Sequence, residues 1–288
     1  GIDSIPLLLS PSGPLANDLI EMGTVEYVSF APVQTITCFT RTGKPLKVPF
    51  KKEHIMLESS ISLLDKRRLM SFIESFREFD DASFDQMLAK SALSDDVVDL
   101  IKYGICFLKS AEDNLPDLKL REKIEKYFKS LPQPFLYPLH GSSEICQALV
   151  RTSAVHGAVQ LLNQRDHVSQ FEYEGKPIDV QAMDVVKCDV YDQKCAHACL
   201  VNQVSLFGES GVRMYVFAPN DTFKSTLFIL QLDESTLCLK SPGFLIHFWS
   251  YQISIEELKA RLDELFNDIG IVEKLTFETV DCNLDFDY

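Results

Sequence analysis

The chain has 288 residues, of which 46% are hydrophobic, and its 42 acidic and 28 basic side chains give a net charge of −14. This charge argues against nucleic-acid binding, which needs a basic surface, and against electrostatic binding to an anionic membrane. No apolar run approaches the roughly 20 residues that span a bilayer, and no basic segment followed by a hydrophobic stretch opens the chain. We therefore expect a globular, cytoplasmic protein without a transmembrane segment.

Residues 1–50 favour a small β-rich region, because β-branched and aromatic residues are concentrated between turn signals. In chain order, the pattern predicts a turn at 11–14, a short helix over 15–22 and strands over 25–30, 35–41 and 46–50.

Residues 51–130 change to helical periodicity. Apolar residues between Leu63 and Phe76 recur at helical spacing, and Ser83–Gln86 has the form of a capping box. Ser94 followed by the acidic residues Asp95 and Asp96 favours a further helix start, since the acids suit the helix dipole, and another helix begins at Asp117. Short connections between such helices predict a small bundle.

Residues 131–288 combine one long helix with a sheet. A turn-rich segment over 131–143 leads into a helix over 144–162, and a capping box at Ser254–Glu257 opens a final helix. Between them, the pattern predicts a largely antiparallel sheet with strands over 198–207, 212–218, 226–232, 236–240 and 243–250. We expect the acidic end, 281–288, to be frayed. The fold class is therefore α+β.

Motifs for catalysis or metal binding are weak. Cys195, His197 and Cys199 would share one face of a strand, with Cys188 upstream, but no second ligand pair closes a zinc site. We favour a half-buried strand of reduced cysteines and no metal. The sequence contains no G-x-G-x-x-G, phosphate-loop or G-x-S-x-G pattern, and its histidines are scattered. These features favour a binding protein without a cofactor over an enzyme.

One segment resembles a known family. Pro134–Gly141, followed by Glu144, Gln147, Arg151 and Ser153–Gly157, is similar to the signature of the Rab GDP-dissociation inhibitors and Rab escort proteins. Further similar segments, in the same order as in the family, are 1–15 and 66–72. Residues 230–247 and the tripeptide 134–136 look closer to escort proteins.

The resemblance implies a non-enzymatic binder of GDP-bound Rab GTPases. Residues 1–50 and 131–288 would form a Rab-binding, flavoprotein-like domain with mixed and antiparallel sheets, incomplete at its N-terminus. Residues 51–130 would form an all-helical domain that contacts the lipid and the Rab geranylgeranyl transferase. An escort protein presents Rabs for geranylgeranylation, as the accessory component of the transferase, and shields the prenyl group. The alternatives are a dissociation inhibitor that recycles prenylated Rabs from membranes, a relative that has lost Rab binding, and a flavin-type oxidoreductase, which the missing dinucleotide fingerprint disfavours.

The resemblance also implies site residues. Glu144 and Arg151 match positions that contact the Rab switch regions, and they would lie on nearly one side of a helix, although a plain surface charge pair is the alternative. Tyr137 and His140 would help to shape that surface. Tyr127 and Phe128 are candidates for the transferase contact. The candidates for a lipid groove, most of which would equally suit a bundle core, are Leu69, Phe72, Ile73, Phe76, Val98, Ile101 and Ile105.

The sequence departs from the family at several positions. His140 replaces a tyrosine, Ser143 replaces a glycine, Cys146 replaces a proline and Ala158 replaces a glycine. The loss of glycine at 143 is expected to restrict the turn that orients Glu144. The family's N-terminal strand, glycine-rich turn and following Rab-contacting segment have no counterpart after Gly1, so we expect either a shortened chain or a divergent member.

Overall fold

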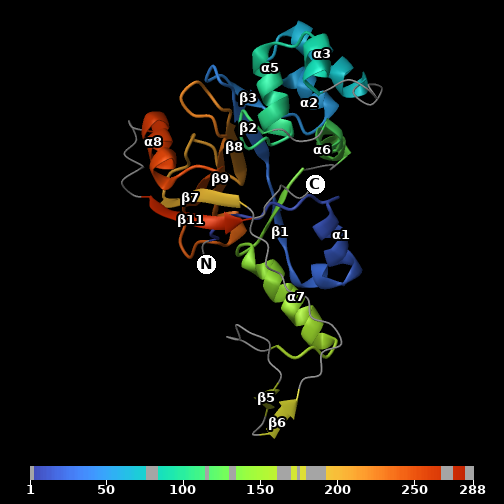
Figure 1. Ribbon diagram of the computed structural model, residues 1–288, viewed down its shortest axis with the longest axis vertical. Coiled ribbons are helices and arrows are strands. Elements are labelled where there is room, and N and C mark those ends of the chain that lie inside the picture. The colour runs from blue at the N-terminus through green and yellow to red at the C-terminus, as the bar shows by residue number, and fades with distance from the viewer. Residues whose placement is uncertain are drawn as a thin grey trace.

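The computed structural model describes residues 3–75, 84–113, 117–129, 134–160, 170–173, 176–179, 193–266 and 275–282. Figure 1 shows a group of helices at one end of the long axis, a twisted sheet beside its middle, and the helix α7 (Ser143–Val155) extending toward the other end. No helix among these residues is both long and apolar enough to cross a membrane.

The central sheet has seven strands in the order β11-β7-β10-β9-β8-β2-β3. Neighbouring strands are antiparallel except for β2 and β8, which are parallel. In chain order, its strands are β2 (Thr35–Phe39), β3 (Pro45–Lys47), β7 (Gln193–Asn202), β8 (Arg213–Phe217), β9 (Leu227–Leu232), β10 (Phe244–Tyr251) and β11 (Thr276–Cys282). This mixed sheet, together with the helices, confirms the predicted α+β class.

Both faces of the sheet are covered, since every residue of the central strand β9 is buried. On one face, α8 (Ile255–Phe266) contributes Leu258, Leu262 and Phe266, which recur at helical spacing, to a cluster with strand residues. Arg261 of α8 is buried and donates hydrogen bonds to the carbonyl oxygens of Phe217 at 3.2 Å and Ala218 at 3.0 Å, which fixes the helix to the end of β8.

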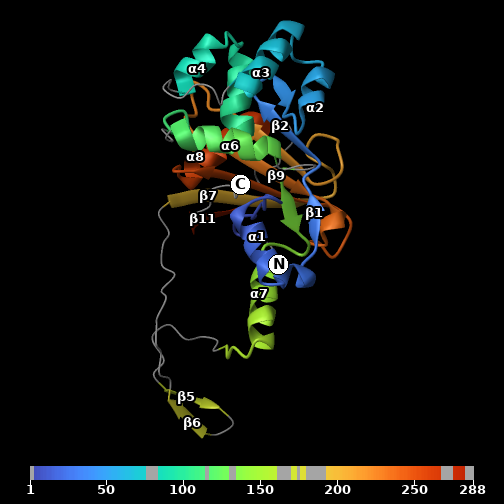
Figure 2. The same cartoon turned by 90° about the vertical axis from the view of Figure 1, so that its right-hand side faces the viewer.

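The helical group lies at the β2–β3 end of the sheet, as Figure 2 also shows. It contains α2 (Lys52–Leu57), α3 (Leu63–Ser75), α4 (Phe84–Lys90), α5 (Asp95–Asp99), the π-helical turn η3 (Leu100–Ile105) and α6 (Asp117–Lys129). Its apolar residues share one buried cluster with β2, β8 and β9. At Gly104, a Cβ atom would lie only 2.8 Å from Cγ2 of Val48, so the absence of a side chain lets η3 lie directly against the sheet region.

A third group surrounds the start of α7. The strands β1 (Phe30–Pro32) and β4 (Leu136–Pro138) pair antiparallel, and α1 (Pro14–Glu21), the 3₁₀ turn η1 (Thr24–Tyr27) and α7 pack beside them. Elsewhere, β5 (Gln170–Tyr173) and β6 (Lys176–Asp179) form an antiparallel pair.

Several predicted elements are wrong. The predicted strand over 25–30 is replaced over 24–27 by η1, which follows Gly23 in the left-handed region at φ 67°. The predicted strand over 236–240 is absent; the 3₁₀ turn η4 (Glu234–Thr236) precedes Leu237 at φ 57°, and the side chain of Asp233 caps this turn. The helix α7 ends at Val155, because Gly157 adopts φ 90°.

The edge strand β11 was not predicted and includes the start of the segment expected to be frayed. Residues 161–162 of the predicted helix over 144–162 and residues 283–288 of the acidic end lie outside the described part of the chain.

Candidate functional site

The helix α7 carries Glu144 near its start and Arg151 in its last two turns. Seven residues of helix advance about 10 Å along the axis and return to nearly the same side. Glu144 is half-buried, Arg151 is exposed, and Gln147 Nε2 donates a hydrogen bond to Glu144 Oε1 at 3.1 Å. The structure therefore places the acidic and the basic candidate on one side of one helix, within reach of a single partner surface.

Arg151 is oriented by an aromatic ring. The guanidinium carbon lies 4.6 Å from the ring centroid of Tyr27, which belongs to η1. This cation–π contact limits the conformations of a long side chain and leaves its hydrogen-bond donors accessible. Sequence analysis did not single out Tyr27, because it lies far from Arg151 in the chain and falls in a predicted strand.

The start of α7 is fixed by Asp3. The carboxylate accepts hydrogen bonds from Tyr137 Oη at 2.7 Å and from Ser142 Oγ at 2.6 Å, and the Ser142 backbone N–H donates to both carboxylate oxygens. Ser142 Oγ also accepts from the backbone N–H of Leu7 at 2.9 Å. These bonds connect the N-terminal segment to β4 and to the first turn of α7.

Tyr137 is buried, so it supports the candidate surface from below and does not contact a partner. Burial and the nearby Asp3 carboxylate raise the pKa of Tyr137 above its usual range, which keeps the hydroxyl protonated as a donor. His140 is exposed, and its backbone N–H donates to the carbonyl oxygen of Thr236 at 2.8 Å.

The turn before α7 does not depend on a glycine at 143. Its left-handed residues are His140 at φ 67° and Gly141 at φ 109°, whereas Ser143 is already helical. At Gly141 a Cβ atom would lie 3.0 Å from Asp3 Oδ1, so glycine suits both the backbone angle and the close approach. The expected restriction from the loss of glycine at 143 is therefore wrong.

The lipid-groove candidates form the interior of the helical group. Leu69, Phe72, Ile73, Ile101 and Ile105 are buried, Val98 is partly buried against them, and Phe76 lies outside the described residues. A lipid chain could reach these side chains only if the helices moved apart.

Of the two transferase-contact candidates, Tyr127 is buried and Phe128 is partly buried, with their ring centroids 5.4 Å apart. Tyr127 is therefore not available to a partner in this conformation, whereas part of Phe128 remains accessible.

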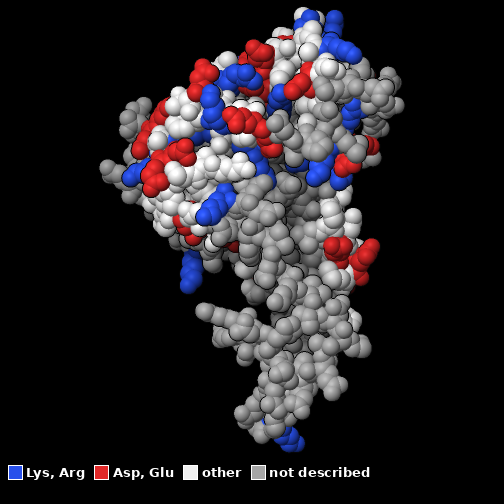
Figure 3. Space-filling model, viewed as in Figure 1, with Lys and Arg blue, Asp and Glu red and all other residues white. Residues whose placement is uncertain are grey.

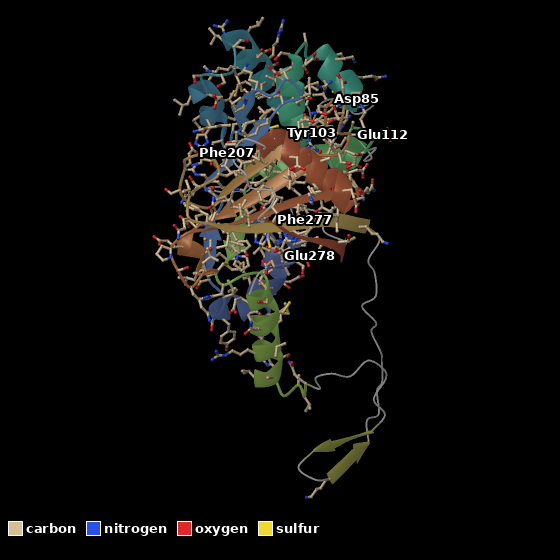
Figure 4. All side chains as sticks on the ribbon, turned by 90° about the vertical axis from the view of Figure 1, so that its left-hand side faces the viewer. Asp85, Tyr103, Glu112, Phe207, Phe277 and Glu278 are labelled. Atoms are coloured by element: carbon tan, nitrogen blue, oxygen red, sulfur yellow. The ribbon has the colours of Figure 1, made fainter. Side chains whose placement is uncertain are left out.

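Cys195, His197 and Cys199 lie along one face of β7, where His197 is bound on both ring nitrogens. Its Nδ1 lies 2.9 Å from Glu278 Oε1 of β11, and its Nε2 lies 3.1 Å from His247 Nδ1. Burial lowers the pKa of His197, and burial followed by the charge of His197 lowers the pKa of His247 to about 3, so both imidazoles are neutral at pH 7. Figure 4 shows Glu278 on the sheet. Sequence analysis did not identify Glu278 as a partner of His197, because β11 was not predicted.

Among the residues that the structure describes, no group of three or more histidine, cysteine or acidic side chains could hold a metal ion.

Comparison with solved structures defines the class of fold. An oxidoreductase from Methanosarcina mazei is 15% identical with a TM-score of 0.56 and covers 100% of this chain and 78% of its own. Substrate-bound putrescine oxidase is 12% identical with a TM-score of 0.57 and covers 99% of this chain and 75% of its own. The chain therefore has the α+β fold of flavoprotein-like proteins.

A more similar solved structure is the Rab GDI of Plasmodium falciparum, which has a TM-score of 0.74 at 15% identity and covers 97% of this chain and 73% of its own. Residues 1–213 match the family model described as GDP dissociation inhibitor. The chain belongs to the GDP dissociation inhibitor family, whose members are non-catalytic.

Curated relatives carry the same description. A guanosine nucleotide diphosphate dissociation inhibitor of Arabidopsis thaliana is 29% identical over 208 residues, which cover 65% of this chain and 46% of the relative. A second inhibitor of the same plant, named guanosine nucleotide diphosphate dissociation inhibitor 1, is 28% identical over 320 residues, which cover 97% of this chain and 71% of the relative. A probable secretory pathway GDP dissociation inhibitor of Schizosaccharomyces pombe is 28% identical, and the match covers 64% of this chain and 46% of the relative. The chain thus spans about half the length of two of these relatives.

Proposed function

We propose that the protein binds Rab GTPases in their GDP form, in the cytoplasm, through the exposed side of α7. Family membership and the similarity to a Rab GDI support this proposal. The observation that carries it is the placement of Glu144 and Arg151 on one accessible side of a helix whose start is fixed by Asp3 and whose basic residue is oriented by Tyr27.

The geometry suits recognition of a protein surface. An arginine with its guanidinium plane already positioned loses less conformational freedom when it pairs with a carboxylate of the partner. An acidic group on the same side then requires a donor or cation on the partner at a defined separation. Two opposite charges from positions about 10 Å apart along the helix axis therefore set the register of docking, which is how charge complementarity gives specificity.

Replacing both residues, as Glu144→Ala with Arg151→Ala, is expected to weaken binding of GDP-loaded Rab about 100-fold, because each partner charge would lose its counterpart. The change should leave thermal unfolding unaltered, since neither side chain is fully buried. Titration calorimetry with purified Rab measures the affinity.

The matched control for this variant is Glu256→Ala with Lys259→Ala, which removes an exposed acidic and basic pair from α8. It should bind Rab like the unaltered chain. Equal affinity of the Glu144, Arg151 variant and this control would refute the proposed site.

We further propose that residues 51–130 act as a helical unit that shields the prenyl group, beside a Rab-binding unit formed by 1–50 and 131–288. Each CH₂ group removed from water contributes about 0.8 kcal/mol of favourable binding free energy. Burial of a whole prenyl chain can therefore offset the cost of separating helices that are packed together in its absence. The buried state of Leu69 and Ile101 requires that opening.

The escort role is a second candidate, favoured by the escort-like segments 134–136 and 230–247. An escort protein must also bind the Rab geranylgeranyl transferase, for which the partly buried Phe128 is the available candidate. Co-purification with the transferase at micromolar concentration is expected for an escort protein. A dissociation inhibitor would bind Rab but leave the transferase unbound.

A further inference from the structure

Four large apolar side chains are exposed together where α2 ends and α3 begins. Met56 is 51% exposed, Leu57 78%, Leu63 58% and Leu64 56%. Single exposed apolar residues are ordinary on a protein surface, but four within residues 56–64 concentrate apolar surface at one helix junction, which is typical of an interaction site. We call Met56, Leu57, Leu63 and Leu64 the apolar tip.

The sequence of α3 forces this exposure. Leu69, Phe72 and Ile73 are buried and define the side of the helix that faces the core. At 100° per residue, Leu63, Leu64 and Arg67 lie on the opposite side. Leu63 and Leu64 therefore cannot be buried by the described fold without withdrawing the core residues of α3.

Basic side chains adjoin the apolar tip. Lys66 Nζ donates to the backbone carbonyl oxygen of Met56 at 2.9 Å, which joins the two helices, and Arg67 is exposed. Within the described residues, neither cation forms an ion pair. Two nearby carboxylates are engaged instead, because Glu58 accepts from the Ser60 N–H and Asp65 accepts from the Ser62 hydroxyl. Figure 3 shows Lys and Arg at this end of the molecule.

We propose that the apolar tip and its cations dock on the surface of an anionic lipid membrane. The helices α2 and α3, which carry the tip, belong to the helical group at one end of the long axis, away from α7 (Figure 1). Exposed leucines insert among acyl chains near the headgroups, and Lys66 and Arg67 meet the lipid phosphates and carboxylates. The net charge of −14 disfavours membrane binding by the rest of the surface, so it orients the protein with this end toward the lipid.

This docking is independent of Rab binding and goes beyond it. The test uses the full chain without Rab and vesicles of phosphatidylcholine with about 30% phosphatidylserine, with flotation as the readout. The unaltered chain should float with these vesicles at low salt. Leu63→Ser with Leu64→Ser should reduce the bound fraction about tenfold, and Arg67→Glu or high salt should reduce it several-fold.

The matched control is Ile20→Ser with Val155→Ser, which removes equally exposed apolar side chains, 59% and 69% accessible, far from the apolar tip. It should bind vesicles like the unaltered chain. Failure of the unaltered chain to float, or equal flotation of the Leu63, Leu64 variant and the control, would overturn the proposal and leave the tip as a site for a protein partner.

Discussion

Arg41→Ala is expected to lower the free energy of unfolding by about 3 kcal/mol, because it leaves a buried carboxylate without its cation. Asp99 is fully buried, and the Arg41 guanidinium binds it with Nη2 2.6 Å from Oδ1. The estimate is at the lower end for buried pairs, since the Arg41 side chain is 49% exposed and its backbone N–H still donates to Asp99 Oδ2 at 2.9 Å. Chemical denaturation followed by circular dichroism measures the change.

This ion pair matters for the whole molecule because Arg41 follows β2 of the sheet and Asp99 ends α5 of the helical group. The double change Arg41→Ala with Asp99→Ala also removes the unpaired buried carboxylate. The double variant should therefore be more stable than the Arg41→Ala variant. A double variant that is less stable than the single variant would show that the buried carboxylate is not the source of the loss.

Asp3→Ala is expected to lower the free energy of unfolding by about 2–3 kcal/mol and to weaken Rab binding. The carboxylate accepts from Tyr137 and Ser142, and its loss leaves the buried Tyr137 hydroxyl without its strong acceptor. The first turn of α7 would then no longer be fixed, so Glu144 would have to be ordered on binding. Denaturation and Rab titration on the same sample measure both effects.

Two controls separate this role from a general effect of lost charge. Tyr137→Phe removes only one of the bonds to Asp3 and should cost about 1 kcal/mol. Asp18→Ala removes an exposed carboxylate on α1 and should change neither stability nor affinity. An Asp3→Ala variant as stable as Asp18→Ala would contradict the proposed anchor.

The elements that could be predicted were those with strong local periodicity. The helices α3, α6 and α8, and the strands β8, β9 and β10, follow from apolar spacing and capping residues alone. The failures have physical causes of a different kind. β11 is an edge strand of mixed polarity that is held by pairing with β7, and η1 and η4 depend on left-handed residues that sequence patterns do not reveal.

The candidate site shows the same division. Glu144 and Arg151 could be identified because both lie in one motif and their spacing of seven residues corresponds to about two turns of a helix. Their supports could not be identified, since the Asp3–Tyr137 bond joins residues 134 positions apart, and the Arg151–Tyr27 contact joins different elements. Burial of the lipid-groove candidates was equally hidden, because core and groove residues have the same composition.

The central claim is a preference for the GDP form of Rab, and the most direct test compares GDP-loaded and GTP-loaded Rab in titrations against the unaltered chain. We expect tight binding of the GDP form and at least tenfold weaker binding of the GTP form, a difference of about 1.4 kcal/mol or more. The preference should disappear with Glu144→Ala and Arg151→Ala. Absence of binding to either form by a correctly folded chain, or equal affinity for both, would contradict the proposed function.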